Sequence, residues 1–198
     1  MDIEPIIKQQ FSKIFNQDDW MVFKLMADYY FESAATILKA DIRIDDTYKL
    51  MARNIQKRLF IGIGGELLLK SLFLKNDFCI NKVKREKTPN PQKPTKFKTI
   101  LDKEILNPSE TYSFNKLIEN LSDVTTFSDE DTIKKGLKIA KVFRNKEGHV
   151  VVLWHKPDRQ NYTDVENSIM AIYNEGFNET LEYKISFMDG EKSIFDRK

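Results

Sequence analysis

The sequence predicts an all-α protein, an antiparallel helical bundle in which residues 1–198 form one domain. Apolar residues recur at spacings of three and four over most of the chain, which is the period of an amphipathic helix. Only 7 glycines occur, and few segments alternate with the period of two that is typical of strands. The apolar fraction of 41% is enough to form a packed core, which we place at about residues 18–177.

Helical spacing predicts three segments in the first part of the chain. A short amphipathic helix opens it, with its apolar side formed by Ile3, Ile6, Ile7, Phe11 and Phe15. A second helix is expected from about Asp18 to Leu38, and because apolar residues cover more than half of its circumference we expect it to lie centrally. A third region begins near Asp45 and continues toward Leu74. Since each interior glycine costs a helix about 1 kcal/mol, Gly62-Ile63-Gly64-Gly65 predicts a kink or a break there.

A long basic loop is predicted at about residues 76–107. Four prolines disfavour a helix through this part of the chain: Pro89, Pro91, Pro94 and Pro108. Basic residues crowd between Lys82 and Lys98 against one acid, Glu86. Such a loop is either a solvated connection or a contact for phosphate groups.

The second half of the chain is again predicted to be helical. Apolar spacing favours one helix at Ser109–Leu121, another from Asp129, and a long one at about Asp164–Phe177. Ser128 suits an N-cap, and the acids that follow it suit the positive end of the helix dipole. In the tail, residues 178–198, the alternation of Leu181–Phe187 indicates a short strand or an extended arm.

Composition and the absence of common motifs exclude several classes of protein. The 32 basic and 30 acidic side chains leave a net charge of +2, which argues neither for nor against a nucleic-acid partner. A single cysteine, Cys79, excludes a disulfide framework and favours a reducing compartment. The longest apolar stretch, Leu59–Leu74, contains Glu66 and Lys70, so we expect no membrane span and a soluble, cytoplasmic protein. No Walker loop, dinucleotide fingerprint or HExxH motif is present.

One arginine falls on the apolar side of the helix that starts at Asp129. At about 100° per residue, Leu137, Ala140 and Arg144 all lie within roughly 40° of Ile133. Arginine cannot lose its proton and is costly to bury without a partner. We therefore expect Arg144 either to pair with an acid from another helix or to point into a polar crevice.

His149 follows Arg144 by five residues, which is roughly 140° around an unbroken helix. The two side chains can meet if the chain turns at Gly148, a natural helix terminator, or if two chains meet across a two-fold axis. An imidazole that takes the 2′-OH proton and a guanidinium that stabilises the phosphate would suffice to cleave RNA without a metal. On spacing alone the alternative is structural, with Arg144 in an ion pair and His149 as a cation at the helix end.

Two short segments resemble HEPN domains. Arg144-Asn145-Lys146-Glu147-Gly148-His149 resembles their R-x4-6-H motif in the form with asparagine after arginine, and Glu66-Leu67-Leu68-Leu69-Lys70 resembles an earlier HEPN helix that reads E-L-x-x-K. The resemblance implies a helical bundle that dimerises and brings two motifs into one cleft. It also implies a metal-independent endoribonuclease of a prokaryotic toxin or antiviral defence system. One branch of the family carries tyrosine two residues after the histidine, where this chain has Val151.

The resemblance assigns roles to the motif residues. His149 would be the general base or acid, Arg144 would bind the scissile phosphate, and Asn145 would orient one of them or contact RNA. Lysines on the same helix would follow the RNA backbone: Lys138, Lys141 and Lys146.

Two further residues, Glu66 and Lys70, have two interpretations. They are either a simple i,i+4 pair worth about 0.2–0.5 kcal/mol, or Glu66 is the acid that orients Arg144 across the bundle.

The sequence thus predicts RNA as the substrate, a homodimer, no cofactor, no metal, and an antitoxin or regulatory protein as a further partner. Two alternatives remain: a HEPN-like module that binds RNA or protein without catalysis, and an unrelated bundle in which Arg144 and His149 are structural. His155, at a turn before Lys156-Pro157, is expected on the surface because nothing at metal-ligand spacing accompanies it.

Overall fold

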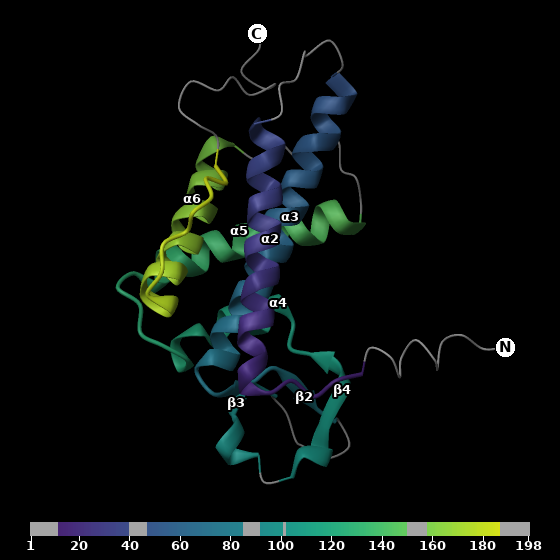
Figure 1. The fold of residues 1–198 in the computed structure, drawn as a ribbon, viewed down its shortest axis with the longest axis vertical. Coiled ribbons are helices and arrows are strands. Elements are labelled where there is room, and N and C mark those ends of the chain that lie inside the picture. The colour runs from purple at the N-terminus through teal and green to yellow at the C-terminus, as the bar shows by residue number, and fades with distance from the viewer. Residues whose placement is uncertain (1–11, 40–46, 85–91, 101, 150–157, 187–198) are drawn as a thin grey trace, which may run out of the picture.

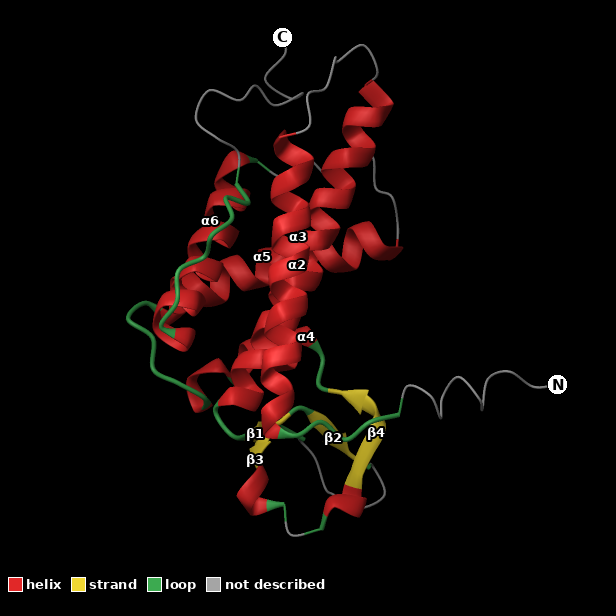
Figure 2. Ribbon diagram, in the orientation of Figure 1, coloured by secondary structure: helices red, strands yellow, loops and turns green. Residues whose placement is uncertain are grey.

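A computed structural model describes residues 12–39, 47–84, 92–100, 102–149 and 158–186. Within these ranges the chain is mostly helical, with five α-helices, and two small two-stranded sheets lie together at one end (Figures 1 and 2). The predicted all-α class is therefore confirmed for the helical majority and wrong for the sheets. Among these residues no helix combines the length and apolar character needed to cross a membrane.

Two long antiparallel helices, α2 (Trp20–Lys39) and α3 (Thr47–Lys75), form the centre of the fold. A 3-10 turn, η1 (Gln17–Asp19), precedes α2, and Asn16 and Asp19 form a capping box there. The buried side of α2 carries Ala27, Phe31 and Ala34, whereas its opposite side is exposed. Helix α2 thus lies centrally, as expected, but only part of its apolar circumference is buried in the described chain.

Helix α3 continues through the glycines without the predicted break. A Cβ added at Gly62 would lie 2.6 Å from the Arg144 backbone nitrogen, and one at Gly64 would lie 2.7 Å from the Phe31 ring. The glycines therefore allow two other helices to approach α3 closely. The packing energy of these close helix crossings offsets the low helix propensity of glycine, which a local prediction cannot anticipate.

Helix α5 (Glu130–His149) crosses α3 and packs against α6 (Arg159–Ala171), which continues as a π-helix, η6 (Ile172–Phe177) (Figure 1). The predicted apolar face of α5 is confirmed, since Ile133, Leu137 and Ala140 are fully or almost fully buried. The N-cap differs from the prediction. Asp129 accepts a hydrogen bond from the Thr132 amide, while both the amide and hydroxyl of Ser128 donate to Glu175.

Two other predicted helices have different boundaries in the structure. Their ends are set by N-cap hydrogen bonds and by strand pairing rather than by the spacing of apolar residues. The segment predicted as helix Ser109–Leu121 divides into strand β4 (Leu106–Thr111), helix α4 (Phe114–Glu119) capped by Ser113, and a 3-10 turn, η5 (Leu121–Asp123). Helix α6 starts before Asp164, where Asp158 accepts a hydrogen bond from the Asn161 amide.

The described part of the predicted basic loop is ordered by short strands. β1 (Phe78–Cys79) pairs antiparallel with β3 (Thr95–Lys96), and β2 (Asn81–Val83) pairs antiparallel with β4. Two 3-10 turns, η3 (Phe97–Thr99) and η4 (Lys103–Ile105), link them. These strands are too short to show alternation, which explains why the sequence indicated only a loop.

The two ends of the described chain are held by hydrogen bonds to strand β2 and to helix α6. The predicted helix from Ile3 to Phe15 falls mostly outside the described residues, and residues 12–16 are not helical. The Phe15 amide donates to the buried Asn81 side chain over 2.9 Å. Residues 179–186, which we call the arm, form no strand but run extended beside α6 (Figure 1), held by hydrogen bonds from the Ile185 and Ser186 amides to Glu166.

The crossing of α3 and α5 predicts opposite effects for two glycine substitutions. We expect Gly62→Ala to lower the free energy of unfolding by about 1–3 kcal/mol, because the nearest atoms belong to the α5 backbone and cannot move aside. Gly65→Ala is the matched control: its Cβ would lie 3.4 Å from Phe114, an ordinary contact, so the gain in helix propensity of up to about 1 kcal/mol should dominate. Urea unfolding of both variants measures the difference, and equal stabilities would contradict the close crossing.

Candidate functional site

A cluster of charged side chains lies where α5 crosses α3. Glu66 on α3 forms two ion pairs. One joins it to Nε of Arg144 on α5 at 2.8 Å, and the other to Nζ of Lys70, one turn along α3, at 3.0 Å. The Glu66 side chain is only 10% exposed, whereas the Arg144 side chain is 42% exposed. Both interpretations of Glu66 are therefore present at once: it forms the local pair with Lys70 and also holds Arg144 across the bundle.

The local sequence explains why these groups meet. Arg144 comes one turn after the buried Ala140 on the apolar side of α5, as the helical wheel predicts. Gly62 brings the α5 backbone against α3 one turn before Glu66, so the guanidinium reaches the carboxylate. A buried carboxylate is stable only with partners, and here two cations share it.

A cavity of about 390 Å³ opens beside this cluster. Its lining combines the charged groups with an apolar rim, and consists of Leu59, Ile63, Glu66, Leu67, Lys70, Arg144 and Asn145. Two cations and one carboxylate leave the lining with a formal charge of +1. The Nε atom of Arg144 is engaged by Glu66 and Nη1 lies within hydrogen-bond distance of Asn145, and a partly exposed guanidinium can bind an anion through its other N–H groups.

Four of the residues predicted from the sequence thus line one cavity: Glu66, Lys70, Arg144 and Asn145. Asn145 is exposed and lies beside the guanidinium, with 3.5 Å between Arg144 Nη1 and Asn145 Oδ1. Sequence reasoning did not identify the apolar rim, although Leu59, Ile63 and Leu67 are spaced at i, i+4 and i+8 on one side of α3.

Two of the lysines predicted to follow RNA, Lys138 and Lys141, are not part of this lining. Lys141 donates to the Asn115 side chain of α4 over 2.6 Å, which holds it away from the cavity, and Lys138 is exposed on α5. Lys146 lies in the last turns of α5, and its side chain is outside the described residues.

The histidine of the motif lies at the end of α5, which includes Gly148 and His149. The interpretation in which the chain turns at Gly148 is therefore wrong. A glycine commonly ends a helix by adopting the left-handed conformation, but a helix can also continue through glycine at a modest cost. The side chain of His149 is outside the described residues, as is all of His155, so the two-fold arrangement stays a prediction.

Comparisons with protein-family models, with curated proteins and with solved structures find no match for this chain. The part of the chain that the structure describes contains no group of three or more His, Cys, Asp or Glu side chains suited to hold a metal ion. The function is therefore argued from the α3–α5 cavity and its charged groups.

The cluster predicts energetic coupling between Glu66 and Arg144. We expect Arg144→Met to destabilise the fold by about 1–2 kcal/mol, because Glu66 stays buried with one cation while Arg144 itself is partly solvated. Arg144→Met combined with Glu66→Gln should cost less than the sum of the single changes, with a coupling of about 1 kcal/mol. A double-mutant cycle in urea measures this coupling, and additivity within about 0.3 kcal/mol would show that the pair does not contribute.

Proposed function

We propose that this protein is a metal-independent endoribonuclease of HEPN type, from a prokaryotic toxin or antiviral defence system, with a composite active site at a homodimer interface. The observation that carries the proposal is the guanidinium of Arg144, fixed by the buried Glu66 at the wall of a cavity and followed by a histidine on the same helix. A fixed guanidinium loses little freedom when it binds a phosphate, so it suits the stabilisation of a phosphorane-like transition state.

Charge at the cavity is compatible with RNA. Glu66 on its own would repel a phosphate, but Lys70 and Arg144 both contact it and leave the lining positive. Asn145 adds an exposed amide that can donate to a phosphate oxygen or accept from a ribose hydroxyl.

Helix geometry favours a site shared between two chains. Along α5, His149 is displaced from Arg144 by about 7.5 Å of helix rise and by roughly 140° of rotation, so one chain cannot easily direct both at one phosphate. A second chain can supply the missing imidazole. The partly exposed Leu59, Ile63 and Leu67 around the cavity form an apolar rim that such a chain can cover.

The proposed reaction uses only these groups. One His149 accepts the proton of the ribose 2′-OH, whose oxygen attacks the adjacent phosphorus. Arg144 binds the non-bridging oxygens as charge builds on them. The bond to the 5′-oxygen breaks, and the leaving oxygen takes up a proton from the solvent, to which His149 returns its own. The products are a 2′,3′-cyclic phosphate and a 5′-hydroxyl.

RNA cleavage by the purified chain in EDTA tests the proposal. We expect cleavage of a labelled single-stranded RNA to continue in the chelator, and to fall at least about 100-fold in both Arg144→Ala and His149→Ala. His155→Ala is the matched control, since it removes the chain's other histidine, and should keep the activity. Binding of RNA without cleavage would reject the nuclease in favour of an RNA-binding module.

Mixing the two inactive variants tests the shared site. If Arg144 of one chain acts with His149 of the other, an equal mixture of Arg144→Ala and His149→Ala should recover about a quarter of the wild-type rate, because half of the dimers each contain one intact site. Light scattering of each protein checks whether the subunits form dimers. Exchange of subunits without any recovery would contradict a site built from two chains.

A further inference from the structure

A second and larger cavity, of about 700 Å³, lies between α2 and the arm. We call it the arm groove. Its walls include Leu25, Asp28, Tyr29 and Glu32 from α2, and Leu181 and Tyr183 from the arm. None of these residues belongs to the α3–α5 cavity, and none was singled out by the sequence as a binding residue.

The arm groove is strongly acidic. Asp28, Glu32, Glu179 and Glu182 line it together with one cation, Lys24, so its formal charge is −3 in a chain whose net charge is +2. Lys24 is already engaged, at 3.2 Å from Asp28 and 2.7 Å from Glu179. Among the described residues Glu32 and Glu182 have no cationic partner, and both are exposed. Two carboxylates at the edge of the groove are therefore available to a ligand.

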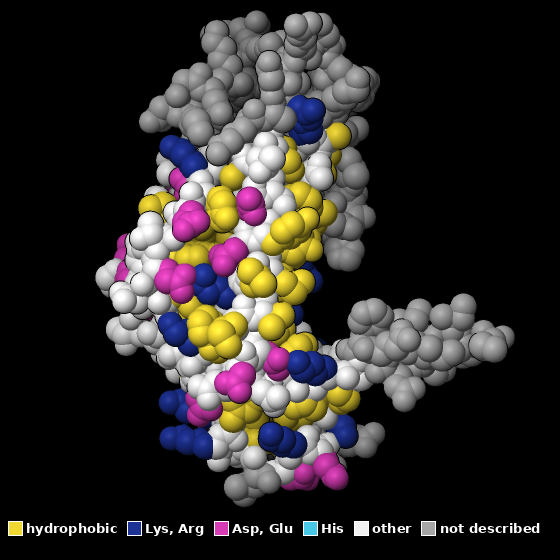
Figure 3. Space-filling view, viewed as in Figure 1, with side chains coloured by type: hydrophobic (Ala, Val, Ile, Leu, Met, Phe, Trp, Pro, Cys, Tyr) yellow, Lys and Arg dark blue, Asp and Glu magenta, His cyan; other side chains and the backbone are white. Residues whose placement is uncertain are grey.

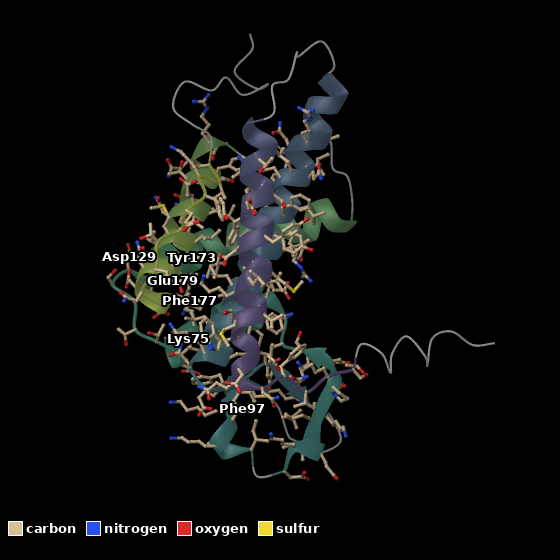
Figure 4. All side chains as sticks on the ribbon, viewed as in Figure 1. Lys75, Phe97, Asp129, Tyr173, Phe177 and Glu179 are labelled. Atoms are coloured by element: carbon tan, nitrogen blue, oxygen red, sulfur yellow. The ribbon has the colours of Figure 1, made fainter. Side chains whose placement is uncertain are left out.

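The lysine within the groove shows how an ammonium group binds there. Nζ of Lys24 lies 5.0 Å from the centre of the Tyr173 ring and 5.8 Å from that of Phe177, in addition to its two carboxylates. Figure 4 shows Tyr173, Phe177 and Glu179 together between the end of α6 and α2. Aromatic rings and carboxylates are the groups that stabilise organic cations. Tyr183 beside Glu32 and Glu182 repeats this combination at the open edge.

The negative field at this edge affects Tyr183. Partial desolvation, together with the carboxylates of Glu32, Glu182 and Asp28, raises the pKa of its hydroxyl. The phenol therefore stays protonated to a higher pH than a free tyrosine.

An apolar stripe on α2 borders the arm groove. We define it as the exposed residues Met21, Val22, Leu25, Met26 and Tyr29. Leu25 is 70% exposed and Tyr29 is 65% exposed, and hydrophobic side chains gather on the face that carries α2 (Figure 3). Leu25, Met26 and Tyr29 belong to both the stripe and the groove, so the two form one continuous surface. Contiguous exposed apolar surface marks interaction sites.

Charge decides which partner this surface fits. A second copy docked antiparallel on the stripe would set Glu32 against the exposed Asp18, just before the start of α2, and a parallel copy would set Glu32 against Glu32. Both arrangements oppose like charges, which disfavours pairing. A partner segment with one apolar side and one basic side matches both the stripe and its acidic edge, and the i, i+4, i+8 spacing of Met21, Leu25 and Tyr29 suits a helix.

We propose that the α2 stripe and the arm groove together dock an amphipathic basic helix of another protein. Its apolar side packs on Met21, Leu25 and Tyr29, and its lysine or arginine side chains reach Glu32 and Glu182. The proposal is independent of the nuclease, since it uses none of the residues at the α3–α5 cavity.

A fluorescein-labelled synthetic peptide of leucine and lysine, about 18 residues long and patterned as an amphipathic helix, is the probe. We expect its anisotropy to rise with added full-length protein at physiological salt, and that of a peptide with glutamate in place of lysine to stay unchanged. A shuffled leucine–lysine peptide without an apolar side should bind at least about tenfold more weakly. Equal binding of the shuffled peptide would show only nonspecific attraction and overturn the proposal.

Paired variants locate the binding surface. Glu32→Gln with Glu182→Gln, and separately Leu25→Ser with Tyr29→Ser, should each weaken peptide binding about tenfold or more. Glu104→Gln with Glu110→Gln is the matched control, because it removes the same charge at the sheet end of the molecule. All these side chains are outside the core, and circular dichroism checks that the variants fold.

Two results would reject the proposal. The first is undiminished peptide binding by the Glu32/Glu182 variant. The second is a change from dimer to monomer in light scattering for the Leu25/Tyr29 variant, which would assign the stripe to a second copy of this chain. RNA cleavage by the Glu32/Glu182 variant, measured in parallel, should equal that of the wild type, so failure here is distinguishable from failure of the nuclease.

Discussion

The close crossing of α5 over α3 at Gly62 is the constraint on which the rest of the charged site depends. Without a Cβ at that position, the backbone of α5 near Ala140 and Arg144 can lie directly against α3. That approach places the Arg144 guanidinium 2.8 Å from Glu66. It also buries the Glu66 carboxylate, which therefore needs a cationic partner. A larger residue at position 62 would separate the helices and the ion pair together, since both rest on the same interhelical distance.

Glu66 couples the core to the cavity. Its carboxylate is almost fully buried, so it requires cationic partners, and those partners are the groups that line the cavity. One interaction therefore stabilises the fold and positions Arg144. This arrangement explains how a partly exposed arginine is kept in one place without losing its capacity to bind an anion.

The two cavities differ in sign, which separates their partners. The lining of the α3–α5 cavity has a formal charge of +1 and suits a phosphate, whereas the arm groove has −3 and suits a cation. Helix α2 has apolar residues on two sides. Ala27, Phe31 and Ala34 pack in the core, while the stripe lies on the surface beside the arm groove. The proposed RNA cleavage at one cavity and the proposed helix docking at the other would therefore use no side chains in common.

The sequence by itself determined the helical character of the chain, the apolar face of α5 and the presence of Arg144 on that face. These properties follow from spacing along one helix, where each residue's direction is set by its number. The pairing of Arg144 with Glu66 was one of two interpretations, because it depends on which helices meet. Only the tertiary structure decided that the glycines of α3 serve close packing rather than a break, that the basic segment forms short strands, and that the arm groove exists. Each of these depends on groups far apart in the chain, such as Gly62 with Arg144 or Lys24 with Glu179, and no local pattern contains the distance between them.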